Sequence, residues 1–269
     1  MLLGSTSSQA TKNFDCSNAD HGKTLRVVGL TDDGFLVCFN EQSPRHTRQI
    51  GYVGGLVSPD TRLVGIDFRV QDGELYGVGD GGGVYKLDTT NAAATQVSVL
   101  TQALNGTSFG VDFNPAADRL RIVSDTGQNL RHNVNAGGTT LADGGLNYTA
   151  GIAALGIVGA AYTNNDLDPQ TATTLFDLDV TMDQIAVQAP PNNGSLGATG
   201  RTTIDADAAA GFDIFSELRG SIARSNRGYA VLSSGGYSAF YRVSLLTGTA
   251  QLLGTFRQNV TDIAVPLDR

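Results

Sequence analysis

The sequence predicts an all-β fold, a five-bladed β-propeller built from four-stranded antiparallel blades. The first observation is a phrase that recurs about every fifty residues, in which a small residue precedes an aspartate and an apolar residue. Its copies begin at Gly65, Gly110, Gly159, Gly211 and Val260. Each copy except the last leads into short strand-like runs joined by Gly/Asp turns. A period of this length with four strands per unit is typical of propeller blades.

Composition is the second observation. The 269 residues include 34 glycines, two methionines and no tryptophan, which suits many strands joined by tight turns rather than a helical protein. The formal net charge is −8, whereas a nucleic-acid surface needs concentrated positive charge. No apolar run approaches the roughly 18 residues of a spanning helix. We therefore expect no nucleic-acid partner and no membrane insertion.

The third observation concerns the two ends of the chain. Five hairpins are predicted, at residues 24–40, 75–88, 120–134, 174–188 and 229–244. The first hairpin has no inner strand before it, and the strand at 259–265 has no hairpin after it. We predict that this C-terminal strand completes the first blade, because such closure leaves no open sheet edge. Six blades is the alternative, since residues 189–210 are loosely patterned.

The first 23 residues are polar and lack apolar periodicity, which predicts an extended leader (1–23) before a single propeller domain (24–269). Cys16 lies in this leader, and Cys38 lies in a predicted strand. A disulfide between them would attach the leader to the first blade in an oxidising compartment. Two buried, reduced thiols are the alternative. The disulfide favours a secreted or cell-surface protein.

Local motifs supply no catalytic constellation. The G-x-G-x-x-G run at Gly77–Gly82 precedes a strand and not a helix, which indicates a hairpin turn and not a phosphate site. Asn164–Asp168 begins like a calcium loop, but Pro169 and Leu175 stand where an EF-hand needs glycine and glutamate. The three histidines are far apart in the sequence, which argues against a zinc site.

Four copies of the repeated phrase place an aspartate at the equivalent position. These are Asp67, Asp112, Asp213 and Asp262, and the remaining copy has Ala161. Innermost strands surround the channel of a propeller, so the carboxylates could form an axial ring that binds a ligand or Ca²⁺. Such groups repel one another unless a cation or an arginine neutralises them. We favour the alternative that each aspartate accepts hydrogen bonds from backbone or arginine of the neighbouring blade.

One long phrase carries a family resemblance. Phe109–Pro115, followed by Asp118–Arg121 and Ser124–Arg131, resembles the hallmark of a bacterial family of uncharacterised function, DUF4394. Gly65–Arg69 and Leu75–Gly77 resemble the repeated elements of the same family, and the resemblance covers residues 24 to 269. It implies a propeller-like, usually exported protein without an established activity, so no catalytic residue is carried over. Ala161 departs from the family's pattern.

The hallmark concentrates polar side chains on one hairpin. Strand alternation places Arg119 and Arg121 on one face, and Asn129 and Arg131 share a face of the partner strand. Polar groups inside a blade must be paired. Either they form a buried Arg/Asp network that locks two blades, or Asn129 and Arg131 face an anionic or sugar-like ligand.

These observations favour an exported, non-catalytic binding or scaffold protein. Its partner would be an unknown small molecule, a glycan or an envelope protein, bound on a rigid ring with variable loops. The alternative is an extracellular carbohydrate-active hydrolase or lyase that uses carboxylates at the channel mouth. No cofactor is expected apart from Ca²⁺ at the repeated aspartates.

Overall fold

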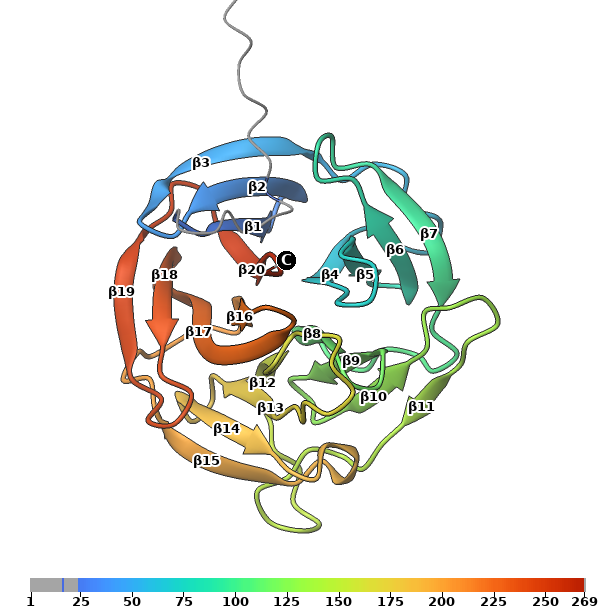
Figure 1. Ribbon diagram of the computed structural model, residues 1–269, viewed down its shortest axis with the longest axis vertical. Coiled ribbons are helices and arrows are strands. Elements are labelled where there is room, and N and C mark those ends of the chain that lie inside the picture. Colours follow the sequence, from blue (N-terminus) through green and yellow to red (C-terminus); the bar gives the residue numbers. More distant parts are fainter. Residues whose placement is uncertain (1–15, 17–23, 269) are drawn as a thin grey trace, which may run out of the picture.

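The computed structural model describes Cys16 and residues 24–268, so the rest of the predicted leader lies outside the described residues. Within that part, the strands form five four-stranded antiparallel sheets that stand as blades around a central axis (Figure 1). The predicted all-β, five-bladed propeller is confirmed. No helix of the described residues has the length and apolarity to cross a bilayer.

The strands of each blade are given from the axis outwards. Blade 1 contains β20 (Val260–Ala264), β1 (Arg26–Thr31), β2 (Phe35–Asn40) and β3 (Ser43–Tyr52). Blade 2 contains β4 (Leu63–Phe68), β5 (Leu75–Gly79), β6 (Gly83–Leu87) and β7 (Ala94–Val99). Blade 3 contains β8 (Phe109–Asn114), β9 (Arg119–Ser124), β10 (Asn129–His132) and β11 (Thr140–Ala142). Blade 4 contains β12 (Ile157–Tyr162), β13 (Leu175–Asp179), β14 (Gln184–Gln188) and β15 (Leu196–Arg201). Blade 5 contains β16 (Ala210–Arg219), β17 (Ile222–Ser234), β18 (Tyr237–Val243) and β19 (Ala250–Thr255).

The ring closes as predicted. β20 pairs antiparallel with β1, with Val28 opposite Ala264 and Leu30 opposite Asp262. In Figure 1 the red β20 lies beside the blue β1. The loosely patterned stretch 189–210 contains a short 3₁₀ helix, η1 (Pro191–Asn193), and then β15, the outer strand of blade 4. It therefore adds no sixth blade.

Packing between neighbouring blades forms the core. Blades 2 and 3 meet where the rings of Tyr76 and Phe113 stand edge to face, 5.1 Å apart. Blades 1 and 5 meet through Phe39 and Phe240, whose ring centroids are 5.0 Å apart. Apolar side chains occupy both faces of the inner strands because each face is covered by another blade, and all six residues of β12 are buried.

The small residue of the repeated phrase has a packing function. At Gly110, a Cβ atom would lie 2.5 Å from the backbone nitrogen of Ala160 on the next blade. At Gly211, it would lie 2.6 Å from the Cα atom of Asp262. Innermost strands approach so closely around the axis that a larger residue would push two blades apart.

Blade 5 departs from the predicted pattern. Its β16–β17 hairpin extends through Arg219 and Ile222, whereas the pattern placed the start of the second strand at residue 229. The extension packs against the turn that resembles a calcium loop. There, the amide of Ala223 donates to buried Asp166 at 2.8 Å. The extension is polar, so apolar alternation could not reveal it.

The predicted disulfide between Cys16 and Cys38 is confirmed. Their Cα atoms are 6.2 Å apart, and both residues are buried. The bond therefore attaches the leader to β2, in the core between blades 1 and 2.

Candidate functional site

The repeated aspartates converge on the axis from the innermost strands of four blades. Carboxylate oxygens of Asp67, Asp112 and Asp213 lie within 4.8 Å of one another, and all three residues are buried. Asp262 on β20 is half-buried and lies close enough to Asp213 to interact with its charge. Ala161 on β12 occupies the fifth position. We call these four carboxyl groups the axial carboxylates.

Each axial carboxylate accepts a hydrogen bond from the innermost chain segment of the next blade. The backbone donors and distances are Phe113 to Asp67 at 2.7 Å, Tyr162 to Asp112 at 3.1 Å, Val265 to Asp213 at 2.5 Å and Ile66 to Asp262 at 2.8 Å. Buried backbone amides need such partners. The aspartates thus connect adjacent blades, through backbone amides and not through arginines.

The alanine at position 161 has a compensating hydrogen bond. The donors Phe113 and Tyr162 directly follow the repeated position, so the equivalent donor beside Ala161 is the amide of Ile214. That amide donates instead to Oδ1 of Asp213, at 2.5 Å. Asp213 therefore uses one oxygen for each of two amides, and the missing carboxylate leaves no amide unpaired.

Burial is the main cause of raised pKa values among the axial carboxylates. Burial raises the pKa of Asp67, and the nearby charge of Asp213 raises it further. Burial also raises the pKa of Asp112, and the nearby charge of Asp67 adds to that rise. Burial raises the pKa of Asp213 to about 7, against the opposing effect of its two backbone hydrogen bonds. Burial likewise raises the pKa of Asp262. Protons or a cation must therefore neutralise part of this group near neutral pH.

Asp67, Asp112 and Asp213 are the residues that could hold a metal ion, because each offers an oxygen to one small space. Calcium at this position stays a prediction, and an unchanged melting temperature with and without chelator would count against it. The hydrolase alternative is not supported. It needs two free carboxylates across an open funnel, and each axial carboxylate already accepts a backbone amide.

A cavity of about 320 Å³ opens at the end of the ring where the innermost strands begin. We call it the funnel. Its wall comes from the β1–β2 turn (Thr31–Gly34), from Thr61–Val64 and Thr107–Phe109 at the starts of β4 and β8, and from Ala208–Ala210 at the start of β16. Asp262 also lines it, so the funnel reaches the axial carboxylates.

The funnel combines one exposed aromatic ring with many polar groups. Tyr52 is 59% exposed, and its ring stands edge to face on Phe35 at 5.5 Å, which limits its movement. Apolar side chains, hydroxyl groups and charges share the rest of the lining. They include Leu56, Phe109, Thr31, Ser108, Thr261, Asp32, Asp33 and Arg62. Such a mixture suits a small ligand with both an apolar face and hydrogen-bonding groups.

Sequence reasoning missed the aspartates that fix the funnel's rim. Asp80 accepts hydrogen bonds from the amide and hydroxyl of Thr61, at 2.7 and 2.6 Å. Asp125 accepts the same pair from Thr107, at 2.9 and 2.6 Å. Asp32 accepts from Asn259 at 2.9 Å. A signal was present, because each aspartate lies in the turn between the second and third strands of its blade and recurs with the blade period.

The hallmark hairpin forms a polar network between blades 3 and 4. The buried Arg121 donates to Asn129 at 2.6 Å, to Asp143 at 2.7 Å and to Asn192 at 2.9 Å. Arg131 pairs with Asp143 as well, at 2.8 Å. The amide nitrogen of Asn129 donates to two backbone carbonyls, so this side chain is fully used within the protein. The blade-locking network is therefore present, and Asn129 and Arg131 belong to it.

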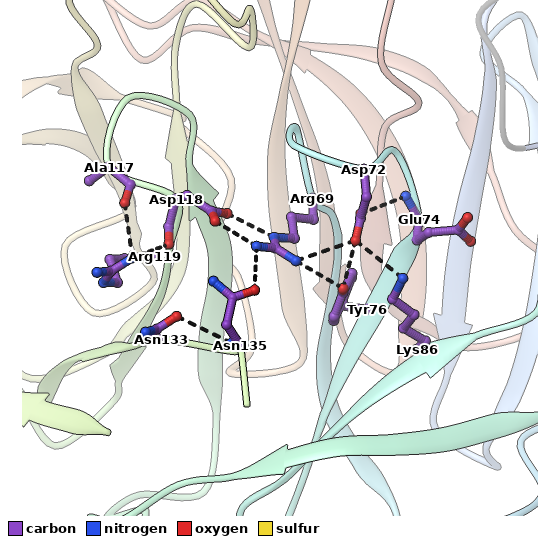
Figure 2. A network of polar contacts seen from close by, with 10 residues as sticks. All are labelled: Arg69, Asp72, Glu74, Tyr76, Lys86, Ala117, Asp118, Arg119, Asn133 and Asn135. Carbon is purple, nitrogen blue, oxygen red and sulfur yellow. Dashed lines mark hydrogen bonds and ion pairs between the residues drawn. The ribbon is translucent and has the colours of Figure 1, made fainter. Parts of the chain in front are cut away.

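A related network joins blades 2 and 3 (Figure 2). Arg69 donates from Nε and Nη2 to the carboxylate of Asp118, at 2.7 and 2.5 Å. It also bonds Asp72 and the hydroxyl of Tyr76, both at 3.3 Å. These hydrogen bonds raise the pKa of Arg69, whose charge is thereby held. Figure 2 shows the Asp118 carboxylate turned towards Arg69, with Arg119 on the other side of the same turn.

Comparison with known proteins gives a family. The model of a family described as a domain of unknown function, DUF4394, matches residues 35–264. None of the curated proteins compared with the chain matches its sequence. A chain in the crystal structure of a nidogen/laminin complex is similar in fold, with 11% identity and a TM-score of 0.49 over 92% of this chain and 100% of that one.

Two bacterial structures are similar as well. An auxiliary nutrient binding protein from Bacteroides thetaiotaomicron shares 13% identity at a TM-score of 0.43, over 85% of this chain and 59% of that one. TolB from Acinetobacter baumannii shares 11% identity at a TM-score of 0.44, over 93% of this chain and 68% of that one. Likeness this remote carries no information on ligands or activity.

Proposed function

This chain belongs to the DUF4394 family, and we propose that it is a non-catalytic binding protein whose ligand occupies the funnel. The funnel of about 320 Å³ is the observation that carries the proposal, because its volume falls within the range of small-molecule sites. Its rim is fixed by the Asp80 and Asp125 hydrogen bonds, so a ligand would meet a preformed surface.

The lining favours an uncharged ligand that carries several hydroxyl groups, such as a mono- or disaccharide. Tyr52 offers an exposed ring for an apolar face, the hydroxyl of Ser108 can donate or accept, and the hydroxyl of Thr261, which donates to Leu30, can accept. Acidic side chains outnumber the single basic one in the lining, which disfavours an anionic ligand. A glycan chain that presents such a unit would satisfy the same groups.

Export is part of the proposal. The Cys16–Cys38 disulfide supports it, because disulfides persist in oxidising compartments outside the cytosol. The rigid ring could also present the funnel as a scaffold surface towards an envelope protein that carries such a glycan.

The test is a thermal-shift screen of the whole chain against a panel of mono- and disaccharides, followed by calorimetric titration of each hit. Tyr52→Ala should weaken binding about tenfold or more, as truncation of a central aromatic contact does. Tyr237→Ala is the matched control, since Tyr237 is an exposed tyrosine at the start of β18, outside the funnel lining. It should bind as the unmodified chain does.

A panel without any hit would argue against a sugar ligand. Equal binding by the two tyrosine variants would place the ligand somewhere other than the funnel.

A further inference from the structure

A second, smaller cavity of about 80 Å³ lies between blades 3 and 4. It is lined by Asn114, Ala117, Arg119, Arg121, Arg131, Tyr162 and Asn192. The innermost strand β8 starts at Phe109 on the funnel and ends at Asn114 on this cavity. The two cavities therefore lie at opposite ends of the ring, and we call the smaller one the arginine cavity.

We propose that the arginine cavity binds a small oxyanion, the carboxylate or phosphate group of a ligand. Its seven lining residues include three arginines and no acidic residue, in a chain whose net charge is −8. One carboxylate, that of Asp143, pairs with both Arg121 and Arg131. Positive charge therefore exceeds negative charge around the cavity, and guanidinium groups match the geometry of oxyanions.

Arg121 supplies a fixed, buried positive charge. Its side chain is 2% exposed, and its bonds to Asn129, Asp143, Asn192 and Tyr162 leave it no freedom to turn. A buried cation held in this way acts on a neighbouring anion with little screening by solvent.

Arg131 and Asn192 supply donors that the protein does not use. Arg131 bonds Asp143 through Nε, and its two terminal amino groups have no partner among the described residues. The Oδ1 atom of Asn192 accepts a hydrogen bond from Arg121, so the amide nitrogen of Asn192 lies on the side of the amide group away from that bond. No described residue accepts from that nitrogen. Arg119 likewise donates to backbone carbonyls through Nη1 alone.

The acidic groups nearby do not cancel this charge. Asp118 is paired with Arg69 on the far side of its turn, as Figure 2 shows. Asp177 on β13 is buried close to Arg121, and burial raises its pKa well above its usual range, which disfavours its negatively charged form. The cavity has room for a group of a few heavy atoms, because a water molecule in the liquid takes about 30 Å³. Arg131 is one-third exposed, which leaves a route for the anion from solvent.

The test is calorimetric titration of the whole chain at pH 7 with inorganic phosphate and, separately, with acetate, each against chloride at equal ionic strength. We expect one of the two oxyanions to bind. Arg131→Gln should weaken that binding at least about tenfold, the effect of losing one charge-assisted hydrogen bond. Arg242→Gln is the matched control, because Arg242 is similarly exposed and pairs with Glu41 between blades 1 and 5, away from the boundary of blades 3 and 4.

Arg119→Gln provides a second variant in case the first changes the fold, which circular dichroism and the melting temperature would reveal. Phosphate binding without acetate binding would identify a phosphate group, and the reverse a carboxylate. Binding of neither above chloride, or equal weakening in Arg242→Gln, would overturn the proposal. Tyr52→Ala should leave oxyanion binding unchanged, so this result is independent of the funnel.

Discussion

The Oδ2 atom of Asp262 accepts a hydrogen bond from the backbone amide of Ile66 at 2.8 Å, across 196 residues of sequence. The bond links the last strand, β20, to blade 2, while the same strand pairs with β1 in blade 1. Closure of the ring therefore depends on a side chain as well as on strand pairing. The other axial carboxylates repeat this relationship between neighbouring blades.

Asp262→Ala should lower the free energy of unfolding by about 1–3 kcal/mol at pH 5, because the amide of Ile66 loses its acceptor. Asp262→Asn keeps an oxygen acceptor and should cost less. Urea denaturation of both variants measures the difference. Equal losses would mean that this hydrogen bond does not stabilise the closure.

Stability should fall as the pH rises from about 4 to above 7. The raised pKa of about 7 at Asp213 means that the folded chain binds a proton over a range in which the unfolded chain has released it. This stabilisation is fully present below the pKa of Asp213 in the unfolded chain, and it is lost as the pH rises through the pKa of Asp213 in the folded chain. For Asp213 alone this amounts to about 4 kcal/mol at most.

Urea denaturation between pH 5 and pH 8 measures this slope. Asp213→Asn cannot ionise and should reduce it, at the expense of one backbone hydrogen bond at every pH. The expectation is wrong if the unmodified chain becomes more stable across this range, or if the variant keeps the full slope.

Ala161→Asp should make the pH dependence steeper. The new carboxyl group would be buried on β12 beside Asp112 and Asp213, while the amide of Ile214 is already bonded to Asp213. The repulsion grows as the groups ionise, so the variant should lose more stability at pH 8 than at pH 5. Ala161→Ser, which introduces a small polar side chain at the same position without a charge, is the control. A loss independent of pH would point to steric crowding.

Arg69→Met should lower the free energy of unfolding by about 2–4 kcal/mol, because it leaves Asp118, Asp72 and Tyr76 without their shared partner between blades 2 and 3. Arg62→Met removes an exposed pair with Asp80 and should cost less than about 1 kcal/mol. Thermal and urea melts of both variants compare the networks. Similar small losses would show that the Arg69 network contributes no more than a surface ion pair.

Reduction of the Cys16–Cys38 disulfide should lower stability by about 3 kcal/mol, since the bond closes a loop with a sequence separation of 22. Melting with and without reductant measures the effect. Cys16→Ser should match the reduced chain and no longer respond to reductant. A response in that variant would mean that the reductant acts elsewhere.

Much of the fold followed from the sequence because its signals are local. Alternating apolar residues and Gly/Asp turns define each hairpin, so the five hairpins and their period could be predicted. Ring closure could be predicted by counting strands, since the strand around Asp262 had no hairpin after it and the first hairpin had no inner strand before it. The extension around Arg219 escaped this reasoning, because it is mostly polar and lacks a regular apolar alternation.

The site depended on how blades face one another, which no local pattern records. The sequence predicted that Asp67, Asp112, Asp213 and Asp262 accept hydrogen bonds from backbone or arginine of the neighbouring blade, but only the tertiary structure decided that the donors are backbone amides. The funnel and the arginine cavity likewise arise where loops and blades from distant segments meet. Their shape and charge are set by distances across the ring, and the sequence encodes those distances only through the packing of the whole chain.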